Sequence, residues 1–302
     1  MIKIGISVSS SYPNQAPQDA TRFMIERTRA ARFAGLDALF VGDHHVTPSP
    51  YYQNNVMLAR MLAEWGDKPF GALYLLPLWH PVLLAEQIAS LSALGTGPFI
   101  MQCGLGDARQ GDAMGIDMSR RVGRFVAALE ILRALWRGER VDEHSFWGLS
   151  QALISPLPSE EIKVWIGAVA LPAIDRASRL GDGWLASPSL TQNEAGAACA
   201  RYQAGCHELN RPVGATAIRR DVLIADSAET ARKTAAPYIA KGYRGIPEQA
   251  LMIGSVEQIA EEMRALEAQG YTDVIIRNIS ADQSICLKSI ELLAEVKAKL
   301  AV

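Results

Sequence analysis

Eight short apolar runs alternate with helical segments along the chain. We expect strands at residues 2–8, 38–41, 70–76, 99–103, 164–167, 183–186, 217–225 and 272–277. We expect helices at residues 19–34, 56–65, 82–94, 122–136, 173–180, 194–209, 228–239, 256–269 and 287–300. Strands that alternate with helices are typical of a parallel sheet. Eight such units in 302 residues predict an α/β fold, a closed (β/α)8 TIM barrel, with a doubly wound open sheet as the alternative.

The domain organisation is expected to be simple. No change in composition marks a boundary, so residues 1–302 are expected to form a single domain. Two segments are longer than ordinary connections. Residues 139–159 are expected to form an insertion that is a small hairpin or a lid, and residues 241–254 a second long loop. In a barrel, such insertions at the C-terminal mouth commonly set the substrate.

Composition excludes several classes of protein. The 30 basic and 32 acidic side chains leave no basic surface for nucleic acid. No apolar run reaches the ~18 residues of a membrane-spanning helix, and MIKIGISVSS is typical of a strand rather than a signal peptide. The four cysteines form no C-x-x-C pair, which disfavours a disulfide framework or a zinc site. We therefore expect a cytoplasmic protein that binds neither nucleic acid nor a membrane.

Polar residues follow the second expected strand, where a barrel places its active site. Asp43, His44 and His45 are adjacent there. They fit a general base with its orienting carboxylate, or a loop in which Asp43 bonds backbone amides. A metal site is disfavoured because neighbouring residues of an extended chain point in opposite directions.

Other candidates follow the third and fourth strands. Trp79 fits a wall for a planar ligand, although on the residues alone a core position is favoured. Gly104 and Gly106 would let the backbone approach a ligand closely. They do not complete a G-x-G-x-x-G fingerprint, because Arg109 occupies the position of the third glycine. Arg109 itself is a candidate for contact with a phosphate.

The fifth and eighth strands offer further phosphate sites. Gly167 and Ala168 lead into a helix whose N-terminus would favour an anion. Arg277 follows the eighth strand, where barrels often bind phosphate. A salt bridge from Arg277 to Asp273 or Asp282 is the structural alternative.

The strings AGLDALFVGDHH, LLPLWHPVLLAEQIASLSAL and IMQCGLG, in this order, resemble the bacterial luciferase-like flavin-dependent oxidoreductases. The resemblance continues through RFVAALEILRALWRGERV, VWIGAVALPAIDRASRLGDGW and GSVEQIAEEMRALEAQGYTDVIIR, and so covers nearly the whole chain. It implies a luciferase-like (β/α)8 barrel that forms a homodimer and binds a flavin at the C-terminal mouth.

The resemblance also implies an activity. Members use reduced FMN supplied by a separate flavin reductase, mostly as monooxygenases, or the deazaflavin coenzyme F-420, mostly to transfer hydride. We expect a two-component monooxygenase that uses reduced FMN and O2 to oxidise a small organic substrate. The alternatives are an F-420-dependent hydride-transfer dehydrogenase or reductase, and a non-catalytic flavin-binding barrel. In the enzymatic versions His44 moves a proton, and His45 and Trp79 contact the substrate.

The resemblance assigns roles near the expected flavin ring. His44 corresponds to the active-site histidine, and Asp43 to an acidic neighbour that would fix its tautomer. His45 corresponds to a second histidine of the luciferase branch. Leu73 and Tyr74 correspond to the place where many members have a bulged, often cis, non-proline peptide behind the ring.

Two departures leave the phosphate anchor open. Gly104 and Gly106 correspond to the family's loop after the fourth strand, but Leu105 stands where luciferases place an arginine on the phosphate. Gly167 and Ala168 correspond to the phosphate loop, where many relatives have two glycines. Besides backbone amides, the remaining candidate anchors are the two arginines named above, at positions 109 and 277.

Overall fold

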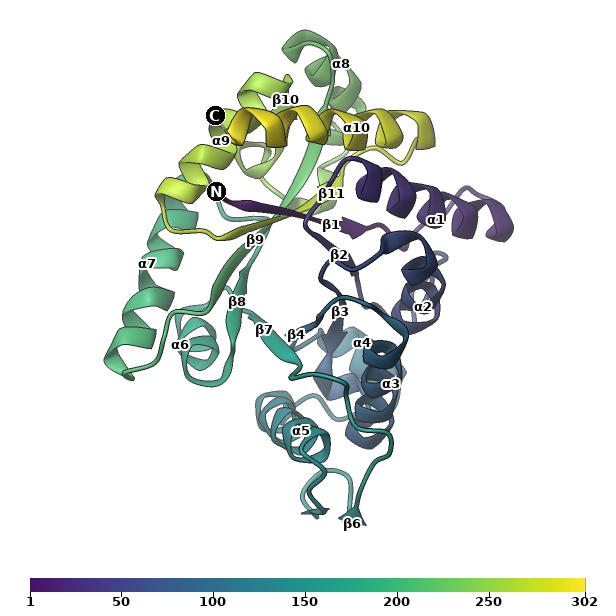
Figure 1. The fold of residues 1–302 in the computed structure, drawn as a ribbon, viewed down its shortest axis with the longest axis vertical. Helices are drawn as coiled ribbons and strands as arrows, with labels where there is room; N and C mark the ends of the chain where they lie inside the picture. Colours follow the sequence, from purple (N-terminus) through teal and green to yellow (C-terminus); the bar gives the residue numbers. More distant parts are fainter. Residues whose placement is uncertain (302) are drawn as a thin grey trace.

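The computed structural model describes residues 1–301 and shows a closed barrel of eight parallel strands with helices around it (Figure 1). The barrel strands are β1 (Lys3–Val8), β2 (Ala38–Val41), β3 (Phe70–Leu75), β4 (Phe99–Gly104), β7 (Lys163–Gly167), β8 (Gly183–Ala186), β9 (Ala215–Ile224) and β11 (Asp273–Asn278). β9 pairs with both β8 and β11, and β11 pairs with β1, so the sheet closes on itself. The eight expected strands are confirmed, and the open sheet is excluded.

The helices are α1 (Pro17–Phe33), α2 (Asn54–Trp65), α3 (Pro81–Leu94), α4 (Ala108–Ala113), α5 (Arg121–Trp136), α6 (Leu171–Leu180), α7 (Gln192–Glu208), α8 (Ala228–Ile239), α9 (Val256–Ala268) and α10 (Gln283–Leu300). Local signals place their starts: Pro81 occupies the first turn of α3, and Ser255 begins α9 with a capping box. Sequence analysis missed α4, whose six residues are too few for a periodic pattern. Within residues 1–301, no helix is long and apolar enough to cross a membrane.

The barrel strands carry apolar residues on both sides, as expected for a sheet covered by helices. Phe40, Trp165 and Ile275 belong to one buried cluster, and the rings of Phe40 and Trp165 lie 5.7 Å apart. A larger cluster joins the outward side chains to the helices. Gly71 of β3 has no room for a side chain, because a Cβ there would lie 1.8 Å from the carbonyl oxygen of Ile100 on β4.

The first insertion, residues 139–159, contains a hairpin, which was one of the two expected forms. β5 (Val141–Glu143) and β6 (Leu149–Ala152) pair in antiparallel fashion. The guanidinium of Arg120 lies over the ring of Phe146, and that of Arg124 over Trp147. These contacts hold the hairpin against α5, and none of the residues 139–159 lines the main pocket of the described chain.

The second insertion is more ordered than the expected loop. It contains two single-turn 3-10 helices, η2 (Tyr243–Gly245) and η3 (Glu248–Ala250), and then β10 (Met252–Gly254). β10 extends the sheet by pairing with the C-terminal part of β9. Three residues are too short a run to reveal a strand by alternation. The η2 turn places Arg244 at the mouth of the barrel.

Candidate active site

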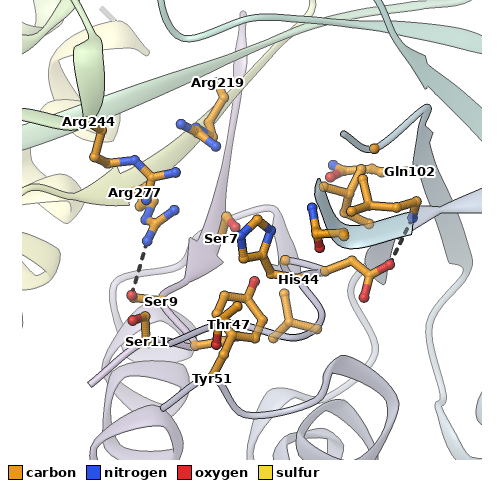
Figure 2. A pocket seen from close by; sticks show the side chains of 18 of the residues that line it. Ser7, Ser9, Ser11, His44, Thr47, Tyr51, Gln102, Arg219, Arg244 and Arg277 are labelled. Carbon is orange, nitrogen blue, oxygen red and sulfur yellow. Dashed lines mark hydrogen bonds between the residues drawn. The ribbon is translucent and has the colours of Figure 1, made fainter. Parts of the chain in front are cut away.

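A pocket of about 630 Å³ opens at the C-terminal mouth of the barrel (Figure 2). Its volume falls in the usual range for small-molecule sites. Its lining comes from β1, β2, β3, β4, β8, β9 and β11, from the loops that follow β1, β2 and β4, and from the η2 turn. Side chains alternate between the two faces of a strand, so Gln102, Arg219 and Arg277 all point inward from their strands. The mouth is thus lined by both apolar and polar groups.

His44 lies in this pocket beside Tyr51, with their ring centroids 5.7 Å apart. Its backbone oxygen accepts a hydrogen bond from Gln53 Nε2 at 3.3 Å, which helps to fix the loop. Burial lowers the pKa of His44, and the positive charge of Arg109 lowers it further. The imidazole is therefore neutral near pH 7 and able to accept a proton from a ligand.

Asp43 does not orient His44, contrary to expectation. Its side chain is fully buried, and Oδ2 accepts hydrogen bonds from the Leu75 amide and from Trp79 Nε1, each 2.8 Å long. Its other oxygen, Oδ1, lies 3.0 Å from His45 Nε2. The reason is the alternation of an extended chain, which turns Asp43 and His44 in opposite directions.

His45 and Trp79 lie behind Asp43 rather than in the lining of the pocket. The edge of one ring faces the other, with centroids 5.5 Å apart. The backbone amide of His45 also donates to Gln110 Oε1 at 2.7 Å. Trp79 therefore holds the Asp43 carboxylate through a hydrogen bond, and His45 lies against it. The predicted contact of both side chains with substrate stays a prediction. Within residues 1–301, no group of three or more His, Cys, Asp or Glu side chains is arranged to hold a metal ion.

Leu73 and Tyr74 face opposite sides of β3. Leu73 lines the pocket, whereas Tyr74 is fully buried and donates a 2.6 Å hydrogen bond to Asn55 Oδ1. β3 pairs with β4 in unbroken register from Phe70 to Leu75. In the described chain the cis peptide bond is Ser155–Pro156. The bulge and the cis peptide implied by the resemblance are therefore absent from Leu73–Tyr74.

The loop after β4 reaches the pocket through Leu105, Gly106 and Asp107. Gly106 has φ +71°, a conformation that suits glycine. Gly104 is not part of the lining. Arg109 Nη1 donates to the backbone oxygen of Val46 at 2.9 Å, so it ties this loop to the one that carries His44.

The loop after β7 lies outside the lining as well. Ala168 is buried, and its backbone oxygen accepts a 3.0 Å hydrogen bond from Trp184 Nε1. A Cβ at Gly167 would lie 3.2 Å from the backbone oxygen of Cys103, which shows how closely β7 approaches β4. Both residues precede the N-terminus of α6. Their predicted contact with a cofactor phosphate stays a prediction.

The opposite side of the pocket is cationic. Arg277 of β11 lines it and donates from Nη2 to Ser9 Oγ at 3.3 Å, and among the described residues it forms no ion pair with Asp273 or Asp282. Arg219 of β9 and Arg244 of η2 join it (Figure 2).

Sequence analysis missed several residues of the lining. These are Arg219, Arg244, Gln102, Tyr51 and the serines at positions 9 to 11. Gln102 carried a detectable signal, because it is a polar residue at an inward position of the otherwise apolar strand β4. Arg219 was less distinct, because β9 also contains Arg220 and Asp221. Arg244 and Tyr51 lie on irregular connections, where no periodicity marks a direction.

Comparison with known proteins agrees with this architecture. Residues 2–249 match the family described as luciferase-like monooxygenase. An F420-dependent glucose-6-phosphate dehydrogenase of Beutenbergia cavernae is 28% identical over 185 residues, which cover 58% of this chain and 55% of that protein. A second such dehydrogenase, of Segniliparus rotundus, is 27% identical over 60% of this chain and 58% of its own. The match thus spans little more than half the length of these curated relatives.

Solved structures resemble the whole fold. The monooxygenase RslO1 of Streptomyces bottropensis superposes with a TM-score of 0.85 at 16% identity, over 100% of both chains. An F420-dependent secondary alcohol dehydrogenase superposes with a TM-score of 0.79 at 16% identity, over 99% of both. At this identity the likeness concerns the fold alone. The match over residues 2–249, together with the closed barrel, shows that this chain belongs to the luciferase-like monooxygenase family of oxidoreductases.

Proposed function

We propose that this chain transfers hydride between coenzyme F-420 and a small substrate that carries a hydroxyl group, with His44 as the proton acceptor. The observation that carries the proposal is the position of His44 in the mouth pocket with a pKa lowered by burial. The curated relatives support the choice of coenzyme, since their names describe F420-dependent dehydrogenases. This choice replaces reduced FMN, the cofactor expected first from the sequence.

The pocket fits a flavin-like ring. Leu73, Leu105 and Ile275 supply apolar surface around it. Gln102 Nε2 and Ser10 Oγ are buried in the lining, and neither has a hydrogen-bond partner among the described residues. Buried polar atoms without partners are costly, so a polar ligand would relieve them. A flat ring with carbonyl and nitrogen acceptors at its edge has the required chemistry.

The protein's own part in the reaction is to hold the substrate and to move one proton. The coenzyme, when bound, supplies the acceptor for the hydride that leaves the carbinol carbon. His44 takes the hydroxyl proton, a role that contributes about 10²- to 10⁴-fold to the rate. Tyr51 packs against the imidazole and limits its rotation. The bonds of Asp43 to β3 and to Trp79 hold the segment that carries His44.

A two-component monooxygenase that uses reduced FMN is the second candidate. The apolar part of the lining favours it, because oxygen chemistry on a flavin requires a site that excludes water. This version needs a partner flavin reductase, which stays a prediction. The homodimer and the cytoplasmic location also stay predictions. A non-catalytic flavin-binding barrel is the third possibility.

Binding titrations separate these candidates. The purified protein is titrated with coenzyme F-420, oxidised FMN and anaerobically reduced FMN. Selective binding of F-420, followed by loss of its absorbance with an alcohol panel, is the expected result. Selective binding of reduced FMN would move the proposal to the second candidate, and binding of none would refute both.

A pair of histidine variants then tests the proton acceptor. His44→Gln is expected to bind coenzyme normally and to lose turnover, whereas His80→Gln is the matched control. His80 is exposed at the start of α3 and lies outside the pocket. Coenzyme reduction by His44→Gln at the wild-type rate would remove His44 from the reaction.

A further inference from the structure

Three guanidinium groups gather on one side of the mouth pocket, and they come from three separate elements. Arg219 points inward from the middle of β9, Arg277 from the end of β11, and Arg244 from the η2 turn. Figure 2 shows all three on the same side, with the imidazole of His44 facing them across the cavity.

One carboxylate, that of Asp221, lies within ion-pair distance of two of these three cations. Asp221 is fully buried, and its Oδ1 accepts a 3.0 Å hydrogen bond from Arg219 Nε. Its Oδ2 accepts a 2.9 Å hydrogen bond from the hydroxyl of Tyr243 and lies 3.9 Å from Arg244 Nε. Arg277 is bonded to a neutral hydroxyl, that of Ser9. The cluster therefore keeps an excess of about two positive charges.

The other acidic side chains of the pocket do not neutralise this excess. Asp43 is enclosed by its three partners on the β2 and β3 side. Asp107 accepts hydrogen bonds from the backbone and side chain of Gln110 at 2.9 and 2.8 Å. Neither is within ion-pair distance of the three arginines in the described chain. The charge on the arginine side is thus left for a ligand.

Burial, and then the proximity of the other arginines, disfavours the positive charge of Arg244. Burial lowers the pKa of Arg244 to about 10, with the charges of Arg277 and Arg219 adding to the effect. Burial likewise lowers the pKa of Arg219. Like charges that are held together away from water destabilise one another. A bound anion would stabilise both guanidiniums in their charged form and so raise both pKa values.

We propose that Arg219, Arg244 and Arg277 form a subsite for a phosphate or sulfonate group carried by the substrate. Each guanidinium offers two parallel donors in a planar fork. One fork satisfies the two oxygens of a carboxylate, whereas three converging forks match a group with three oxygens. This proposal rests on the proposed function in one respect: the molecule that carries the anion is taken to be the substrate that reaches His44.

The depth of the subsite favours a substrate over a cofactor phosphate as the source of the anion. Arg219 pairs with Ile275 in the middle of the sheet and not at the rim, so the anion must enter the barrel beside His44. A small molecule with an anionic end fits this space. The cofactor phosphate has other candidate positions, at the loops after β4 and β7.

Arg244 is the residue best suited to a test. It has φ +51° and stands between Gly242 and Gly245, each with φ +68°, so its side chain reaches the pocket from an irregular turn. It is the most exposed of the ion-paired arginines here, at 40% against 23% for Arg219. Removing its charge should therefore leave the barrel folded.

The test measures binding of inorganic phosphate to the coenzyme-free protein by calorimetry at low salt. Arg244→Met is expected to bind phosphate about 10- to 100-fold more weakly, the range for one lost charge-assisted contact. Arg232→Met, an exposed arginine of α8 outside the pocket, is the matched control and should bind as wild type. Acetate should bind at least about 10-fold more weakly than phosphate.

Several results would overturn the subsite. They are absence of phosphate binding by the wild type, equal loss in the Arg232→Met control, and acetate binding as tight as phosphate. Thermal unfolding reports whether each variant is folded. If Arg244→Met does not fold, Arg244→Lys keeps the charge without the fork and should show a smaller loss than the range above.

A second arm separates substrate from cofactor. Coenzyme F-420 and reduced FMN are titrated against Arg244→Met, and an affinity within about threefold of wild type is expected. A loss that parallels the loss of phosphate binding would assign the arginines to the cofactor phosphate and overturn the proposal. Because the phosphate titration contains no coenzyme, failure of hydride transfer would refute the proposed function and leave the subsite intact.

Discussion

Replacing Asp43 by alanine is expected to destabilise the fold far more than replacing its neighbour His44. The Asp43 carboxylate is fully buried and accepts 2.8 Å hydrogen bonds from the Leu75 amide and Trp79 Nε1. It also lies 3.0 Å from His45 Nε2. Asp43→Ala therefore leaves two bonded donors, the Leu75 amide and Trp79 Nε1, facing a small cavity. The contact with His45 is close but is not a hydrogen bond, because neither His45 Nε2 nor Asp43 Oδ1 has a hydrogen-bond partner among the described residues.

The magnitude follows from the two hydrogen bonds to Asp43 Oδ2. A hydrogen bond to a charged group contributes ~1.5 to 3 kcal/mol, and a buried donor without a partner costs a similar amount. Trp79 and His45 are partly exposed, so water replaces some of what is lost. We expect Asp43→Ala to lower the free energy of unfolding by about 3 to 5 kcal/mol. That is a large part of the ~5 to 15 kcal/mol that stabilises an ordinary domain.

Urea unfolding measures this difference. Asp43→Asn keeps the shape and one acceptor oxygen, so its loss should be smaller than that of Asp43→Ala. His44→Ala is the control, and it should change the free energy of unfolding by less than about 1 kcal/mol, because the imidazole faces an open pocket. A cost of under 1 kcal/mol for Asp43→Ala, or equal costs for the two alanine variants, would refute the account of Asp43 given above.

Three further predictions concern single residues. Because a base must be neutral and burial lowers the pKa of His44, kcat/KM should fall only below pH 6.5 as the solution is acidified; a pH–rate profile with its acidic limb above 6.5 would contradict this. Burial raises the pKa of Glu262 from 4.5 to about 7, so the folded state binds more protons than the unfolded state between these values. The free energy of unfolding should then decrease as pH rises from 4.5 to 7, and Glu262→Gln should flatten the decrease in urea titrations. Gly71→Ala should cost about 3 kcal/mol or more in the same assay, because its Cβ would lie 1.8 Å from the Ile100 oxygen; near-normal stability would show that β3 and β4 can separate.

The elements that sequence analysis located are those with a repeating pattern. β2 has the expected bounds, residues 38–41, and α2 and α3 begin within two residues of theirs. The missed elements are short: α4, the two 3-10 turns and β10. Periodicity needs several repeats before it can be detected. The missed helices have fewer than two turns, and β10 has only three residues.

Only some residues of the candidate site could be predicted from the sequence. His44, Leu73, Gly106 and Arg277 were expected and do line the pocket. The expected pair of Asp43 with His44 is absent, because adjacent side chains diverge. The partners of Asp43 come from β3 and the turn after it. No local sequence pattern indicates that this segment lies beside Asp43.

The sequence by itself determined that this chain alternates strands and helices eight times, and that chemistry would gather where the strands end. Local information suffices for this, since each strand and helix is set by residues within a few positions of one another. Only the tertiary structure decided which side chains meet. Arg219, Arg244 and Arg277 lie on β9, η2 and β11, and the closure of the barrel brings their charges together. Coulomb interactions depend on distance in space, and a linear sequence does not contain that distance.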